Sequence, residues 1–363
     1  MRIIDADTHL GEPAAMWKLL DDRFHARRPI VATVPNDTLY GGKNAFWLID
    51  GHIFPKSAGK GSHLLMTPSD QEDQQSRVDI PLGSRELTDP AQRLREMDEM
   101  EVAVEVVYPT LFLVYLTNDV ELEVALCQAY NRYLADVWKG SGGRLRWVAI
   151  PPLRDISQSL LQIREAKEGG AAGIFFRGIE GDRTLNDSYF FPVYDLAERL
   201  DLPICIHTGA GCPALSNIFD VQYNSTYPHL RTLPLMAFRD LVANKVPEEF
   251  PRLRIGFIEA GASWVPHIFH ILKRQNKLNP RLTPPEICRD YRLFVACEID
   301  EDIPYLINYV GEDNLLIGSD YGHRDQSYEA ELVPQLKARE DLPAGFLDKL
   351  LDRNPAEFYA VRP

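Results

Sequence analysis

The chain begins with Ile3-Ile4-Asp5-Ala6-Asp7-Thr8-His9, a short apolar run that ends in side chains able to bind a metal. Such a run is typical of a buried strand whose last residues point into a site. Residues two apart on a strand face the same way, so we expect Asp7 and His9 to project together. A carboxylate beside an imidazole suits a divalent metal. The alternative is that both side chains only cap local structure.

Three later segments have the same form, an apolar run that ends on a potential ligand or base. The run at 203–209 ends on His207, the run at 254–261 on Glu259, and the run at 314–323 on Asp320. In a barrel of parallel strands, catalytic groups gather at the C-terminal ends of the strands. Core packing alone does not explain why four apolar runs end in this way.

Strand-like and helix-like segments alternate along the chain after residue 92. This alternation predicts a parallel sheet. With the first strand included, eight such strands indicate a (β/α)₈ TIM-like barrel, one domain over residues 1–363. An open doubly wound sheet is the alternative, but no strand is followed by a Gly-rich phosphate loop. The expected strands cover 3–7, 102–107, 145–150, 173–176 and 293–298, with three more that end at His207, Glu259 and Asp320.

Residues 21–90 do not follow this alternation and are rich in Gly, Pro, Ser and Asp. We expect a long irregular insertion after the first strand. Its place in the chain puts it over the C-terminal face of the barrel, where such a connection often forms a lid or a binding loop. The alternative is a surface insertion without a role in the site.

Composition excludes several classes of function. The net charge of −14 argues against a nucleic-acid surface and against adhesion to an anionic membrane. No apolar stretch has the roughly 18 residues that a membrane span needs. The five cysteines include no C-x-x-C pair, and we interpret them as reduced residues of a cytoplasmic protein. A small molecule is therefore the expected partner.

These motifs together resemble the amidohydrolase superfamily, in the amidohydrolase-2 branch that contains aminocarboxymuconate-semialdehyde decarboxylase. The resemblance rests on residues spread over the whole chain. They are Asp5 to His9, His207-Thr208-Gly209, the stretch from Phe250 to Arg254 with Glu259 to Trp264, Gly318 to Tyr321, and the closing Asn354 to Tyr359.

The resemblance implies one divalent metal at the mouth of a distorted barrel. Carried over by position, its ligands are Asp7, His9, His207 and Asp320. Zinc is the usual ion of the family and our first expectation, with manganese second. Asp7 stands where the commoner H-x-H motif has its first His, and a carboxylate there makes the site harder and more favourable to manganese. Barrels of this branch often pair, so a homodimer is also expected.

A second departure concerns the reaction. Well-studied decarboxylases of this branch have a His at the end of the sixth strand, where this chain has Glu259. A Glu can act as a general base or bind metal, but it cannot supply an imidazolium to a substrate carboxylate. Asp320 is the other candidate catalytic base, because a carboxylate that contacts both metal and water can accept the proton.

Two further residues are candidates for substrate binding. Arg177 directly follows the fourth strand at the active-site end, where it could clamp a carboxylate; an ion pair at the barrel rim is the alternative. His323 lies three residues after Asp320 in the same loop, and it could equally be a surface residue.

The sequence thus predicts a metal-dependent hydrolase that uses an activated water on a small cyclic or aromatic carbonyl compound, cleaving an amide, an ester or a C–C bond. A metal-dependent non-oxidative decarboxylase of an aromatic or unsaturated acid is the alternative. A non-catalytic binding protein on a degenerate barrel is a third hypothesis, which the full set of ligands opposes.

Overall fold

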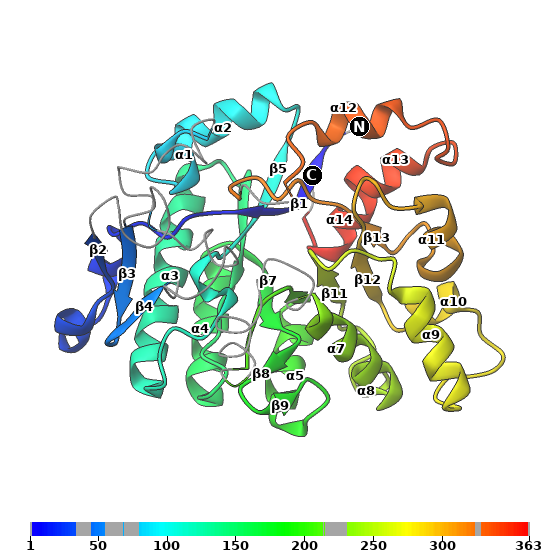
Figure 1. Ribbon diagram of the computed structural model, residues 1–363, viewed down its shortest axis with the longest axis horizontal. Coiled ribbons are helices and arrows are strands. Elements are labelled where there is room, and N and C mark those ends of the chain that lie inside the picture. The colour runs from blue at the N-terminus through cyan, green and yellow to red at the C-terminus, as the bar shows by residue number, and fades with distance from the viewer. Residues whose placement is uncertain are drawn as a thin grey trace.

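The computed structural model describes residues 2–33, 45–54, 68, 80–212, 214, 231–323 and 328–361. Eight parallel strands form one sheet that curls into a nearly closed barrel, with helices on its outside (Figure 1). The order around the sheet follows the chain, as expected for repeated strand–helix units. The strands are β1 (Ile4–His9), β5 (Val104–Tyr108), β6 (Leu145–Ala149), β7 (Ala171–Arg177), β10 (Ile204–His207), β11 (Ile255–Ile258), β12 (Leu293–Ala296) and β13 (Leu315–Leu316).

The seam of the barrel joins the two ends of the chain. The Asp320 N–H donates to the Asp7 carbonyl at 3.0 Å, and the His9 N–H donates to the Tyr321 carbonyl at 2.6 Å. Thr8 and Tyr321 form a parallel bridge just beyond the end of β13. The seam therefore places the motif of the first strand beside that of the last.

Helices cover the barrel, and several begin at an Asp that caps their free N–H groups. The Asp119 side chain accepts from the first turn of α3, and Asp155 does the same for α4. The helices of the described residues are α1 (Leu82–Arg85), α2 (Pro90–Glu99), α3 (Val120–Gly140), α4 (Ile156–Glu168), α5 (Phe191–Arg199), α7 (Thr232–Ala243), α8 (Val246–Glu249), α9 (Val265–Arg274), α10 (Pro284–Asp290), α11 (Ile303–Val310), α12 (Leu332–Ala338), α13 (Phe346–Asp348), the π-helix η6 (Lys349–Arg353) and α14 (Asn354–Phe358), with 3-10 turns at Met16–Leu19, Asp22–Arg27, Leu111–Leu113 and Ser188–Phe190.

The barrel predicted from the sequence is confirmed, and each predicted strand is present with its ends shifted by a few residues. The last strand is the shortest, because the chain leaves regular pairing before Asp320. The helix α10 begins with two prolines, Pro284 and Pro285. A capping box between Thr283 and Glu286 starts this helix.

The insertion is more regular than predicted. Three antiparallel strands, β2 (Ile30–Thr33), β3 (Ala45–Ile49) and β4 (His52–Phe54), form a small sheet beside the barrel (Figure 1). The buried Trp47 packs edge-on against Trp17, which explains why this segment can order. The expectation of an irregular insertion is therefore wrong for these strands. Residues 34–44, 55–67 and 69–79 lie outside the described residues, and the role as a lid stays a prediction.

The described helices include none that combines the length and the apolar character needed to cross a lipid bilayer.

Candidate metal centre

Two histidines at the C-terminal ends of β1 and β10 point the same ring nitrogen into one site. The Nδ1 atom of His9 lies 2.9 Å from the Pro109 carbonyl, and that of His207 lies 2.8 Å from the Thr208 carbonyl. A carbonyl only accepts, so each Nδ1 carries the proton and donates it. Each Nε2 is then the atom with a free lone pair, which is how outer contacts prepare a metal-binding histidine.

Carboxylates surround these two Nε2 atoms. Asp7 Oδ1 lies 3.4 Å from His9 Nε2 and 3.5 Å from His207 Nε2, while Glu259 Oε2 lies 3.1 Å from His207 Nε2. All four side chains offer ligand atoms within 4.8 Å of one another. Asp7 Oδ1 and both Nε2 atoms are buried and have no hydrogen-bond partner in the part of the chain that the structure describes. Converging buried atoms of this kind fit a bound cation.

A second group overlaps the first and contains the residues of the last strand end. His9, Glu259, Asp320 and His323 also offer ligand atoms within 4.8 Å of one another. Asp320 Oδ1 lies 3.2 Å from His9 Nε2 and 2.8 Å from His323 Nδ1. The structure thus brings together all four predicted ligands, although Glu259 takes the place of Asp320 in the group that holds Asp7 and His207. His9 and Glu259 belong to both groups.

The predicted substrate residue His323 lies inside this site rather than at the surface. Its ring stacks on that of His9 with centroids 3.6 Å apart. Its Nε2 lies 2.9 Å from the Thr110 hydroxyl, which also donates to the Leu10 carbonyl at 2.7 Å. Since this hydroxyl has one proton to give, His323 Nε2 is the donor of the shared bond.

The backbone is strained at two of these positions. Glu259 and Asp320 have φ of 52° and 55°, a left-handed conformation that residues other than Gly rarely adopt. Such outliers concentrate at functional sites, where the surrounding structure holds them. Glu259 directly follows β11 and its carboxylate approaches His207, whereas Asp320 lies a few residues after β13 and its carboxylate approaches His9.

Burial and neighbouring charges shift the pKa values of the site residues in opposite directions. Burial would raise the pKa of Asp7, but His207 and His9 lower it below its usual value. Burial would also lower the pKa of His207, but Asp7 and Glu259 raise it to about 9. For His9, burial prevails and its pKa is lowered. The carboxylates therefore stabilise positive charge between them, as a proton or as a divalent cation.

Arg177 pairs with His207 between β7 and β10, but its side chain makes its contacts outside this cluster. Its guanidinium forms a buried ion pair with Glu180 at 2.7 Å and donates to the Phe112 and Val114 carbonyls. These contacts match the alternative of an ion pair at the rim. They weigh against a clamp on substrate, which stays a prediction.

Sequence reasoning missed Thr110 and Glu12, the residues that hold the loop beside His323. The two Glu12 carboxylate oxygens each accept a backbone N–H, from Thr110 and from Leu111, both at 2.9 Å. The position of Thr110, just beyond the end of β5, was the available signal.

A cavity of about 100 Å³ adjoins the cluster, and its polar lining is acidic. Glu298, Asp300 and Glu329 line it together with Asp7, Glu259 and Asp320. No Lys or Arg is among the described residues of its wall.

Comparison with known proteins agrees with this geometry. The model of the amidohydrolase family matches residues 4–361. A curated relative, 2-amino-3-carboxymuconate-6-semialdehyde decarboxylase of Dictyostelium discoideum, is 23% identical over 295 residues, which are 76% of this chain and 77% of the relative.

Solved structures share the fold over the whole length. An amidohydrolase from Mycobacterium avium subsp. paratuberculosis superposes with a TM-score of 0.72 at 20% identity, covering 99% of this chain and 98% of the other. The 5-carboxyvanillate decarboxylase of Novosphingobium aromaticivorans, in complex with manganese and 4-hydroxy-3-methoxy-5-nitrobenzoic acid, gives 0.70 at 16% identity, covering 99% and 96%. With the family match across almost every residue, the chain belongs to the amidohydrolase family.

Proposed function

We propose that Asp7, His9, His207 and Glu259 hold one divalent metal ion, with Asp320 and His323 against it. The donor set supports this proposal, because two imidazole nitrogens and several carboxylate oxygens suit either zinc or manganese. The additional carboxylate of Glu259 shifts the preference from zinc, the expectation from the sequence, towards manganese. The manganese in the Novosphingobium decarboxylase is consistent with this shift.

The proposed reaction is hydrolysis of a small cyclic or aromatic carbonyl compound. When bound, the ion supplies Lewis acidity to the carbonyl and to the attacking water. Glu259 accepts a proton from that water as the new C–O bond forms. It then returns the proton to the leaving group as the C–N, C–O or C–C bond breaks. The observation that carries this proposal is the Glu259 carboxylate, which lies inside the ligand cluster 3.1 Å from His207.

The acidic cavity supports a neutral substrate. Carboxylates of Asp7, Glu259 and Asp320, joined by that of Asp300, would repel an anion that approached from this side. A neutral carbonyl group carries no such penalty.

Non-oxidative decarboxylation is the second candidate, and the relatives favour it. The curated relative and the Novosphingobium structure are both named decarboxylases. In this reaction the C–C bond to the carboxylate breaks, carbon dioxide leaves, and the ring carbon takes a proton.

One screen separates these candidates. Metal-loaded protein is incubated with aromatic acids while carbon dioxide is followed, and with amides, esters and ring-cleavage dienones while their products are followed. Hydrolysis predicts turnover only in the second set. Release of carbon dioxide without turnover of any hydrolytic substrate would replace the first candidate by the second.

Glu259→Gln, with its metal content measured beside turnover, tests Glu259 as the base of the hydrolysis. We expect turnover to fall roughly 10²–10⁴-fold, because the amide can neither accept nor deliver the proton. Unchanged turnover with the metal retained would reduce Glu259 to a structural role.

A further inference from the structure

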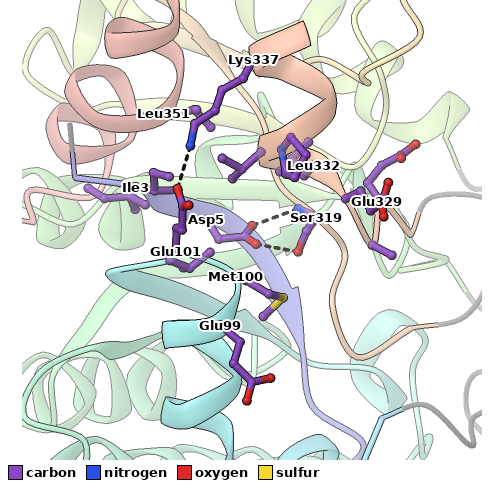
Figure 2. A pocket seen from close by; sticks show the side chains of 16 residues that line it. Ile3, Asp5, Glu99, Met100, Glu101, Ser319, Glu329, Leu332, Lys337 and Leu351 are labelled. Carbon is purple, nitrogen blue, oxygen red and sulfur yellow. Dashed lines mark hydrogen bonds and ion pairs between the residues drawn. The ribbon is translucent and has the colours of Figure 1, made fainter.

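A second and larger cavity lies outside the barrel, between β1, the C-terminal end of α2 and α12 (Figure 2). Its volume is about 320 Å³, against about 100 Å³ for the cavity at the metal centre. Every residue of its wall belongs to the described part of the chain. Glu329 lines both cavities, so the two cavities are neighbours, although their other lining residues differ.

The walls are mostly apolar. Met100 and Val102 follow α2, Leu332 and Val333 belong to α12, and Leu351 comes from η6. Cavities of about 300 Å³ and above, with apolar walls and a few polar groups, are typical of small-molecule sites. The cavity has room for a ring or a short branched chain.

Negatively charged groups outnumber positively charged ones among the lining residues. Five carboxylates belong to the lining but only one cation, Lys337. Lys337 Nζ lies 2.6 Å from Glu101, so its charge is already paired (Figure 2). The carboxylates without a cation among the lining residues are those of Asp5, Glu99, Glu329 and Glu331.

The floor of the cavity is formed by hydrogen-bonded residues that lie next to those of the metal centre. Asp5 is 3% exposed, and it accepts from the Ser319 N–H at 2.9 Å and from the Ser319 hydroxyl at 2.5 Å (Figure 2). The Glu329 N–H donates to the Ser319 carbonyl at 2.9 Å. Asp5 lines this cavity whereas Asp7 joins the metal cluster. The register of β1 against β5 shifts between Asp5 and Thr8, which allows the two side chains to face different cavities.

We propose that this cavity binds a small organic cation with an apolar body, at a site separate from that of the substrate. The apolar body packs between α2 and α12. The ammonium group lies towards Glu329 and, at the mouth, Glu99 and Glu331, where a positive charge meets carboxylates that no lining cation neutralises. An anion of the same shape would be repelled, and a neutral molecule would gain only the apolar contacts.

The first test compares three probes of one shape on the metal-loaded protein. Calorimetric titrations use benzylamine, benzyl alcohol and benzoate, and we expect affinity to fall in that order, with at least a tenfold step from amine to alcohol. Crystals soaked in 4-bromobenzylamine then locate the bromine by its anomalous scattering. No binding of benzylamine, equal binding of the alcohol, or bromine at the Asp7–Glu259 cluster would overturn the proposal.

The second test changes the charge without touching the core. Glu99 and Glu331 are exposed at the mouth, so the double variant Glu99→Gln/Glu331→Gln should fold normally. We expect this variant to bind benzylamine about threefold to tenfold more weakly than the wild type. Its affinity for benzyl alcohol, which is lower from the start, should not change. Glu340→Gln, an exposed Glu outside the cavity, is the matched control and should leave both unchanged. Equal affinity for benzylamine in the double variant and the control would contradict the proposal.

Discussion

His9 and His207 each use one ring nitrogen to fix the direction of the other. The carbonyls of Pro109 and Thr208 accept hydrogen bonds from the Nδ1–H groups, so both Nε2 lone pairs face Asp7 Oδ1. These outer contacts come from backbone atoms, so side-chain substitution leaves them in place. The imidazoles themselves are therefore the informative positions for testing the metal centre.

His207→Ala should lower the affinity for the divalent metal by more than 100-fold, since it removes a ligand and not only an outer contact. Plasma mass spectrometry after dialysis measures the metal bound per chain. His267→Ala removes an exposed imidazole from α9 and serves as the control, with metal content as in the wild type. Full metal content in His207→Ala would contradict the proposed centre.

Glu12 makes the stability of the fold depend on pH. Burial raises its pKa from 4.5 to about 7, against the two backbone N–H groups that favour the ionised form. The folded state therefore holds a proton that the unfolded state has lost. The resulting stabilisation is complete below pH 4.5 and is lost as the pH rises through about 7. At about 1.4 kcal/mol for each pKa unit, it amounts to roughly 3 kcal/mol.

As the pH rises from 4.5 to about 8, the free energy of unfolding of the wild type should fall by the contribution of Glu12. Glu12→Gln cannot ionise, so its free energy of unfolding should fall by roughly 3 kcal/mol less over the same range. Urea unfolding across this range measures the difference. Glu121→Gln changes an exposed Glu in α3 and should keep the pH dependence of the wild type. The same pH dependence in Glu12→Gln would show that Glu12 does not carry the buried proton.

At the scale of elements, the seam requires a close approach of two backbones. A Cβ added at Gly318 would lie 2.4 Å from Asp7 Cβ and 2.7 Å from its backbone nitrogen. Gly318→Ala should therefore push β1 away from the last strand. We expect a loss of about 1–3 kcal/mol in the free energy of unfolding and weaker binding of the metal.

Gly140→Ala is the matched control, because a Cβ at that end of α3 meets nothing within 4 Å. It should be neutral or stabilise by up to about 1 kcal/mol. Urea unfolding and metal titration of both variants provide the comparison. Equal effects of the two substitutions on both measurements would show that the seam tolerates the added methyl group.

The elements also show what the sequence could and could not predict. The barrel and the converging residues could be predicted because four apolar runs each end on a polar side chain, and parallel strands bring such ends together. The small sheet β2–β4 could not, since its order depends on contacts such as Trp47 against Trp17, which no local pattern contains. Glu259, rather than Asp320, joins the group that holds Asp7 and His207. This arrangement depends on left-handed backbone at Glu259 and Asp320, which no sequence pattern predicts.

At the scale of the whole molecule, one buried cation links the first, second and last strands. Arg93 in α2 pairs with Glu105 of β5 at 2.7 Å, and both side chains are fully buried. Its guanidinium also donates to the His9 carbonyl and lies over the Tyr321 ring, 4.0 Å from the centroid. Arg93 therefore connects the residues that close the barrel from outside the sheet.

Arg93→Met should cost about 3–5 kcal/mol of the free energy of unfolding, because Glu105 must keep an unpaired buried charge or take up a proton. The double variant Arg93→Met/Glu105→Leu removes both charges and should recover most of this loss. Arg23→Met breaks an exposed pair with Glu121 and should cost less than about 1 kcal/mol. Urea unfolding of the three variants decides the matter. If Arg93→Met were no more destabilising than Arg23→Met, the barrel would close without help from this ion pair, and backbone pairing at the seam alone would have to hold Asp7 and His9 against Asp320.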